Sequence, residues 1–123
     1  MNITLKKPAN FLVISGDDAL TLPHICLGGD GVISVIANAF PKRFSTMVHA
    51  ALNNNLSLAK EKHYELFEII QQLFADGNPG GIKYVLKLIN LCQDNVRLPL
   101  VNINESTAAK LYELVAAIDD TLA

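Results

Sequence analysis

Two short motifs contain residues that could take part in chemistry. Ser15-Gly16-Asp17-Asp18 places a hydroxyl and two carboxyl groups directly after an apolar run. Asn78-Pro79-Gly80-Gly81-Ile82-Lys83 could form a loop that faces a ligand. Each motif also has a plainer interpretation, a tight turn followed by an aspartate cap for the first and a turn between two helices for the second. Taken singly, neither motif identifies a function.

The histidines and cysteines give no convincing metal site. His24-x-Cys26 could be a pair of ligands, but two ligands are too few for a closed zinc site, so packing of a helix at a subunit contact explains the pair better. His49 and His63 lack a further ligand at suitable spacing and receive no role. Cys26 and Cys92 have apolar neighbours, which predicts buried thiols in a reducing compartment. We expect no metal.

Two apolar runs indicate neighbouring parallel strands. Phe11–Ser15 and Gly31–Asn38 are continuous apolar segments without polar alternation, which is typical of strands buried on both faces. The segment Ala19–Leu27 between them has helical length and ends at two glycines. A right-handed crossover of this kind makes the strands parallel and places Gly16 and Asn38 at the same end.

Apolar spacings of three and four residues predict helices over the rest of the chain. Pro41 suits a helix start, and three asparagines, Asn53-Asn54-Asn55, suit its end. The following helix should bury Ala59, Leu66, Ile70 and Phe74 and expose Lys60, Glu61 and Glu68. Another helix should run from Ile82 to near Cys92, with Leu98-Pro99-Leu100 extended after it. The last helix should follow a cap at Asn104 or Ser106, with Leu111, Leu114, Val115, Ile118 and Leu122 on one face and Asp119-Asp120 exposed.

Length and charge narrow the possible functions. The chain has 123 residues, which is too short for a whole eight-stranded α/β barrel, and two parallel strands do not form a stable sheet by themselves. Its ten basic and twelve acidic residues are spread along the chain, which argues against a nucleic-acid partner. No apolar run approaches the roughly 18 residues that span a bilayer, and the start lacks a signal-peptide pattern. We expect a soluble, cytoplasmic protein without a membrane partner.

The motifs taken together are more specific. They are, in chain order, Ser15-Gly16-Asp17-Asp18, Leu27-Gly28-Gly29-Asp30-Gly31-Val32-Ile33-Ser34-Val35, Ala37-Asn38, Asn78-Pro79 with Lys83, and Arg97-Leu98-Pro99-Leu100. Their order and spacing resemble those of the C-terminal part of the dihydrodipicolinate synthase family, from about Asn10 onward. Related sialic acid aldolases share the fold but usually lack the first and last of these motifs.

The resemblance implies a fold and an assembly. The fold class is α/β: residues 1–55 would form the last two βα units of a (β/α)8 TIM barrel, and residues 56–123 a C-terminal helical region appended to it. The assembly would be a homotetramer built as a dimer of dimers. No cofactor is implied.

The resemblance also implies a reaction and a site. In the family, a lysine of the sixth strand forms a Schiff base with pyruvate, and the resulting enamine attacks aspartate semialdehyde to give 4-hydroxy-tetrahydrodipicolinate in lysine biosynthesis. The substrate-binding positions that match are Gly16, beside the aldehyde; Ile33, whose backbone carbonyl faces the Schiff base; and Asn78, at the mouth of the aldehyde pocket.

No catalytic residue is expected within this chain. The family's lysine, proton-relay tyrosine and substrate arginine would all precede Met1. Lys6 and Lys7 fall at the end of an outer helix and Lys83 in a C-terminal helix, where a structural role is expected. A truncated chain, a split or decayed gene, or a proteolytic remnant would explain this. The alternatives are a non-catalytic barrel fragment acting as a structural or interaction module, and a segment of a sialic-acid-aldolase-like lyase; a Gly-x-Lys strand upstream would favour the enzyme.

Overall fold

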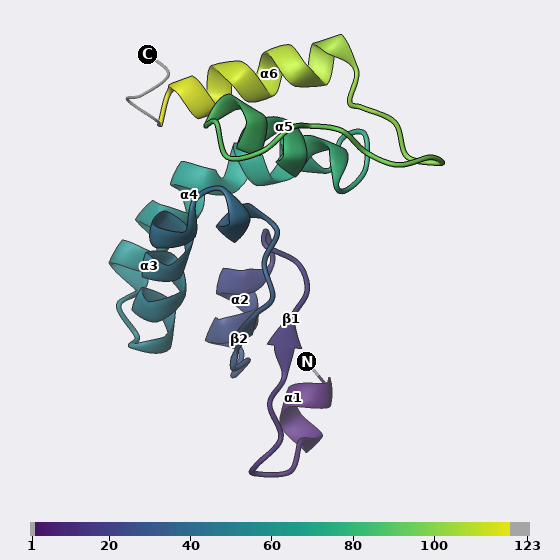
Figure 1. Ribbon diagram of the computed structural model, residues 1–123. Coiled ribbons are helices and arrows are strands. Elements are labelled where there is room, and N and C mark those ends of the chain that lie inside the picture. The colour runs from purple at the N-terminus through teal and green to yellow at the C-terminus, as the bar shows by residue number, and fades with distance from the viewer. Residues whose placement is uncertain (1, 119–123) are drawn as a thin grey trace. The chain divides into compact units, whose positions relative to one another are not determined.

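The computed structural model describes residues 2–118, which form two compact units divided between Tyr64 and Glu65 (Figure 1). This division falls within helix α4. The predicted division into residues 1–55 and 56–123 coincides with the first residue of that helix and stays a prediction. No helix among the described residues is both long and apolar enough to cross a bilayer. The elements are α1 (Asn2–Lys6), β1 (Ile14–Ser15), α2 (Thr21–Cys26), β2 (Gly31–Val32), the 3-10 helix η1 (Ile36–Asn38), α3 (Pro41–Leu52), α4 (Leu56–Leu73), α5 (Gly80–Leu88) and α6 (Glu105–Ala116).

The first unit contains a parallel β-α-β arrangement. Strands β1 and β2 pair in parallel, with Ile14 opposite Gly31 and Ser15 opposite Val32. The backbone N–H of Asp30 donates to the Val13 carbonyl at 2.9 Å and extends the ladder at its amino end. The predicted parallel pairing is therefore confirmed.

Strand β2 is much shorter than predicted. It ends at Val32, and residues 36–38, expected to continue it, form η1. The two apolar runs that were predicted as strands leave several of their side chains exposed, with Phe11 at 56%, Ile14 at 41% and Ile33 at 79%. The expectation of burial on both faces is wrong for this chain, because the described residues provide no third strand beside this two-stranded sheet.

Asp30 ties together the amino ends of these elements. Its Oδ2 accepts hydrogen bonds from Lys7 Nζ and, at 2.8 Å, from the backbone N–H of Val13. The hydrogen bond from Lys7 makes the largest contribution to lowering the pKa of Asp30, and the hydrogen bond from the Val13 N–H makes the next largest. One carboxylate thus links the segment after α1, the start of β1 and the start of β2.

Helix α2 packs against α3 and turns one face outward. Thr21, Leu22 and Ile25 are buried. Cys26 is exposed, which corrects the predicted burial of its thiol. Successive residues of a helix lie about 100° apart around its axis, so Cys26 points away from the face that contains Ile25.

The predicted limits of α3 are confirmed. Pro41 occupies the first turn, where its missing N–H removes no helical hydrogen bond. At the other end Asn54 adopts a φ of 59°, and the N–H of Asn55 donates to the Ala50 carbonyl at 2.8 Å. A residue in the left-handed conformation, followed by a backbone hydrogen bond to the carbonyl five residues earlier, is the Schellman motif that ends many helices. Phe44 and Met47 are buried on the inner face.

Helix α4 shows the predicted apolar stripe with one exception. Ala59, Leu66 and Ile70 are almost fully buried, and the predicted exposure of Lys60, Glu61 and Glu68 is confirmed. Phe74, however, is 43% exposed. The helix ends at Leu73, so Phe74 no longer follows the helical period that predicted its burial.

In the second unit, α5 packs against α6. Helix α5 ends at Leu88, earlier than predicted, because Asn90 adopts a φ of 59° and the Leu91 N–H donates to the Leu86 carbonyl at 2.9 Å. Cys92 therefore lies beyond the helix and is exposed, contrary to its predicted burial.

Helix α6 starts as predicted. The Asn104 side chain accepts a hydrogen bond from the Thr107 N–H at 2.9 Å, which satisfies one of the free donors of the first turn. Leu111 and Val115 are fully buried, whereas Leu114 and Ile118 are half-buried. The predictions for Asp119, Asp120 and Leu122 lie outside the described residues.

Candidate functional site

The carboxyl ends of β1 and β2 bring two of the predicted site residues together. Ser15 lies opposite Val32, so Gly16 and Ile33 are the next residues along the two strands. The backbone N–H of Ile33 donates to the Ser15 carbonyl at 2.9 Å. Two residues that are 17 positions apart in the sequence thus leave the sheet at the same edge.

Both residues are open to solvent at this edge. Gly16 is exposed, and a Cβ atom added there would meet no atom within 4 Å. The exposed side chain of Ile33 extends the same open surface. A small molecule could therefore reach the backbone of either residue.

The turn after β1 is closed by its own side chains. The N–H of Asp17 donates to Ser15 Oγ at 3.1 Å, and this hydroxyl donates back to the Asp17 carbonyl at 3.0 Å. Asp17 Oδ1 accepts the N–H of Leu20 at 3.1 Å. The tight turn of the plainer interpretation is therefore confirmed, whereas its aspartate cap is wrong, because α2 begins after Leu20 without a side-chain cap.

Asp18 differs from Asp17 in its burial and in its hydrogen-bond partners. The sequence motif includes it but predicts no separate role for it. Its side chain is buried, and it accepts the backbone N–H groups of Val35 and Ile36. Nothing local in the sequence distinguishes the two aspartates. Only the approach of two loops gives Asp18 its partners.

Asn78 lies in the other unit, in the loop between α4 and α5. It lines a hollow of about 200 Å³ together with Asp76, Pro99, Leu100 and Val101. The hollow joins two motifs that the sequence only places in order, Asn78-Pro79 and Leu98-Pro99-Leu100. Lys83 follows within α5 and is half-buried, in keeping with the structural role expected for it.

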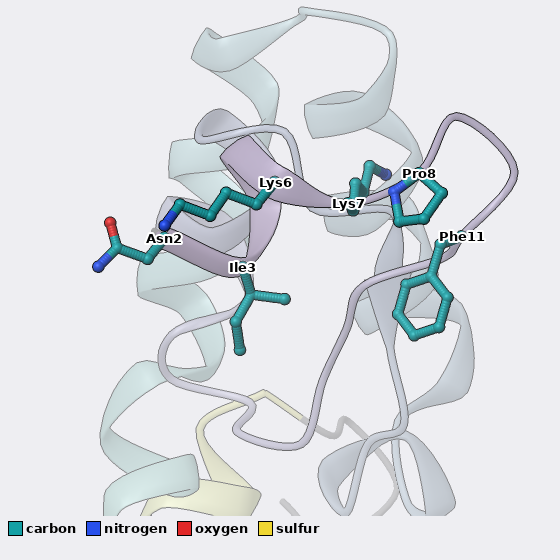
Figure 2. A pocket seen from close by; sticks show the side chains of 6 residues that line it. All are labelled: Asn2, Ile3, Lys6, Lys7, Pro8 and Phe11. Atoms are coloured by element: carbon teal, nitrogen blue, oxygen red, sulfur yellow. The ribbon is translucent and has the colours of Figure 1, made fainter.

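The lysines near the start of the chain lie at the opposite end of β1 from Gly16. Helix α1 ends at Lys6, and Lys7 Nζ donates to Asp30. Lys6 and Lys7 line a hollow of about 470 Å³ with Asn2, Ile3, Pro8 and Phe11. Figure 2 shows Ile3 and Phe11 directed to the same side of it. Among residues 2–118, those that line it include no carboxylate, imidazole or thiol that could act as an acid or base.

Lys42 lies near β2, although the sequence motifs do not include it. Lys42, in the first turn of α3, lines a hollow of about 660 Å³ with Val32, Ser34 and Phe44. It is exposed, whereas lysines that form imines in enzymes are commonly buried in an apolar pocket or placed beside another cation. No sequence pattern marks it, because its place beside β2 follows from the packing of α3.

His24, His63 and Asp94 take part in hydrogen bonding or packing. His24 Nε2 lies 3.0 Å from the Val13 carbonyl oxygen. Burial lowers the pKa of His63, and the bond from Lys87 is the main cause of the lowered pKa of Asp94. Among residues 2–118, no group of three or more histidine, cysteine, aspartate or glutamate side chains could hold a metal ion.

Comparison with known proteins identifies the family. A model of the dihydrodipicolinate synthetase family matches residues 1–118. The chain belongs to this family. It is 47% identical over 111 residues to the 4-hydroxy-tetrahydrodipicolinate synthase of Flavobacterium psychrophilum. The aligned part covers 90% of this chain but 38% of that protein. The corresponding synthase of Archaeoglobus fulgidus is 41% identical over 112 residues, covering 91% of this chain and 39% of the relative.

Solved structures of family members confirm the fold. The crystal structure of dihydrodipicolinate synthase from Aquifex aeolicus matches with a TM-score of 0.91 at 35% identity, over 94% of this chain and 40% of that one. The enzyme from Acinetobacter baumannii, solved in complex with pyruvate, matches with a TM-score of 0.82 at 31% identity, over 86% of this chain and 36% of that one. The expected fold class, α/β with two parallel strands of a TIM barrel and a helical appendage, is therefore confirmed. The chain spans about two fifths of its relatives.

Proposed function

We propose that this chain forms one wall of the substrate site of a Schiff-base lyase that condenses pyruvate with aspartate semialdehyde. The proposal rests on the open edge formed by Gly16 and Ile33 at the carboxyl ends of two parallel strands, in a chain of the dihydrodipicolinate synthetase family. Barrel enzymes build their active sites at this end of the strands. The complex of the Acinetobacter baumannii relative with pyruvate supports the choice of first substrate.

Three residues of this chain have proposed contacts with substrate. Gly16, which has open space around it, would lie beside the aldehyde. The backbone carbonyl of Ile33 would face the Schiff base. Asn78, exposed beside its own hollow, would lie at the mouth of the aldehyde pocket. None of these groups exchanges a proton at neutral pH, so they would bind and orient the substrates.

The Schiff-base lysine would come from polypeptide outside residues 1–123. An imine forms only from a deprotonated amine that faces the bound ketone. Lys6 and Lys7 lie at the wrong end of β1, and Lys7 is paired with Asp30. Lys42 is exposed on α3. Exposed lysines are ordinarily protonated at neutral pH and are poor nucleophiles.

Borohydride trapping with pyruvate tests the proposal. The purified chain alone should gain no stoichiometric mass. The same chain joined to the amino-terminal part of the Flavobacterium psychrophilum synthase that it does not cover, here called the joined polypeptide, should gain one pyruvate adduct on a lysine of that part. The amino-terminal part alone is the control. An adduct on Lys42, Lys6 or Lys7 would contradict the assignment, and so would a folded joined polypeptide without an adduct.

The same assay distinguishes the alternative functions. A non-catalytic structural or interaction module would fold with the amino-terminal part but leave the adduct rate no higher than in the control. The exposed apolar side chains of Phe11, Leu12 and Leu98 favour such association. A sialic-acid-aldolase-like lyase would form the adduct but would not consume aspartate semialdehyde.

We also propose that the protein assembles as a homotetramer and works in the cytoplasm, as the family resemblance implies. No cofactor is proposed, because the lysine imine itself would supply the electrophile. Sedimentation of the joined polypeptide at micromolar concentration tests the assembly. A monomer that forms the pyruvate adduct would show that the tetramer is not required for imine formation.

A further inference from the structure

Asp18 lies between the two loops that follow the strands. It is only 3% exposed, although Gly16 and Asp17 beside it are exposed. Its Oδ2 accepts the backbone N–H of Val35 at 2.9 Å and that of Ile36 at 2.8 Å. These donors follow β2, whereas Asp18 follows β1. One carboxyl oxygen therefore joins the loop after one strand to the loop after its neighbour.

This pair of hydrogen bonds, the Asp18 latch, fixes the segment around Ile33 from one side. On its other side, the Ile33 N–H is held by the Ser15 carbonyl at 2.9 Å. The peptide carbonyl of Ile33 lies between these two anchors, in the same residue as the first and two residues before Val35. Its direction thus depends on both the strand pairing and Asp18.

The neighbouring aspartate provides a natural comparison. Asp17 bonds only within its own turn, where Oδ1 accepts the Leu20 N–H three residues ahead. Among residues 2–118 it forms no hydrogen bond with the loop after β2, whereas the partners of Asp18 are 17 and 18 residues away. Loss of Asp17 should loosen the start of α2 and leave Ile33 in place.

We propose that Asp18 is a positioning residue that holds the carbonyl of Ile33 beside Gly16. It would touch no substrate, because its bonded oxygen is occupied by two backbone donors and its side chain is buried. Its effect on pyruvate rests on the proposed function, whereas the latch itself is a property of the fold. A loop that shifts by about 1 Å can slow a positioned reaction by as much as two orders of magnitude.

The test uses three variants of the joined polypeptide, Asp18→Ala, Asp18→Asn and the matched control Asp17→Ala. Asp18→Ala removes both acceptor bonds and should raise the KM for pyruvate roughly tenfold. Asp18→Asn should restore most of the affinity, since an amide oxygen can accept both N–H groups. The other oxygen, Oδ1, has no partner among residues 2–118, so replacing it by NH2 breaks no hydrogen bond there. Asp17→Ala should leave KM unchanged.

The split between KM and kcat separates positioning from simple loss of stability. Partial unfolding lowers the apparent kcat because fewer molecules are active, but it does not change KM. An unchanged KM, with a fall in apparent kcat that equals the fraction of unfolded Asp18→Ala molecules, would overturn the inference. Should that variant fail to fold, Asp18→Glu, whose longer side chain displaces the acceptor, should raise KM in the same direction.

Amide hydrogen exchange tests the latch independently of activity. The N–H groups of Val35 and Ile36 should be protected in the unmodified protein, lose protection in Asp18→Ala and keep it in Asp17→Ala. Unprotected amides in the unmodified protein would overturn the latch. Protected amides in a folded protein that forms no pyruvate adduct would instead refute the proposed function and, with it, the role of Asp18 toward pyruvate.

Discussion

Asp76 holds Asn104 through two hydrogen bonds, one to each of its carboxyl oxygens. Oδ2 accepts the backbone N–H of Asn104 and Oδ1 accepts its side-chain Nδ2, both at 2.9 Å. Asn104 in turn caps α6 through Thr107. The bond from the Asn104 backbone is the first cause of the lowered pKa of Asp76. A loop carboxylate thus fixes the residue that starts the last helix.

Asn104→Ala should destabilise the second unit. The substitution removes the cap and the side-chain hydrogen bond to Asp76 but keeps the backbone one. A lost cap costs about 1 kcal/mol of unfolding free energy. Urea unfolding followed by circular dichroism measures the change. Asn102→Ala, at an exposed position of the same segment, is the control, and equal midpoints for the two variants would show that the cap contributes nothing.

Gly81→Ala should be far more disruptive than Gly80→Ala. A Cβ at Gly81 would lie 2.3 Å from the carbonyl oxygen of Leu73, which is backbone and cannot rotate away. A Cβ at Gly80 would first meet the side chain of Ile103 at 3.0 Å. We expect a loss of about 4 kcal/mol or more for Gly81→Ala. Thermal unfolding of the two variants side by side checks the order, and equal melting temperatures would contradict this packing of α5.

Leu111→Ala should open a cavity in the second unit. Leu111 is fully buried, and truncation of a buried leucine costs about 2–5 kcal/mol. Its neighbour Tyr112 is 47% exposed, so Tyr112→Ala should change stability by less than about 0.5 kcal/mol. Denaturant midpoints of both variants test the orientation of α6; a larger effect at Tyr112 would mean that the helix is rotated.

Folding of the first unit should weaken as the pH falls through the titration range of Asp30. Lys7 and the Val13 N–H lower the pKa of this carboxyl below its ordinary value of 3.8. Its contribution is therefore present above that value and is lost as the pH falls toward the lowered pKa of the folded state. Asp30→Asn, which cannot titrate, should flatten the dependence of unfolding free energy on pH as the pH falls from about 5. Urea titrations across this range measure the slope, and an unchanged slope would show that the pairing does not stabilise the fold.

Gly16→Val in the joined polypeptide should act on substrate rather than on folding. The space around Gly16 is open, so the melting temperature should hardly change. If Gly16 lies beside the aldehyde, the KM for aspartate semialdehyde should rise roughly tenfold, while pyruvate is still trapped by borohydride at the original rate. An equal loss in both assays would instead indicate that the whole site is disturbed.

The sequence by itself determined the elements that depend on neighbouring residues. Helix spacing, Pro41 and Asn104 predicted the starts of α3 and α6, because caps and apolar stripes act over three or four residues. The parallel pairing also followed, since a strand, a helix and a strand with short loops have one favoured handedness. The shared edge of Gly16 and Ile33 is a consequence of that pairing.

The end of β2, the burial of Asp18 and the exposure of Cys26 depend on tertiary structure. Strand β2 ends at Val32 and gives way to η1, where Val35 and Ile36 bond to Asp18 from another loop. Cys26 is exposed although its neighbours are apolar. Such outcomes depend on which segments approach across long sequence separations. Burial and hydrogen bonds between loops arise from that approach. The periodicity of one segment predicts only which of its own side chains share a face.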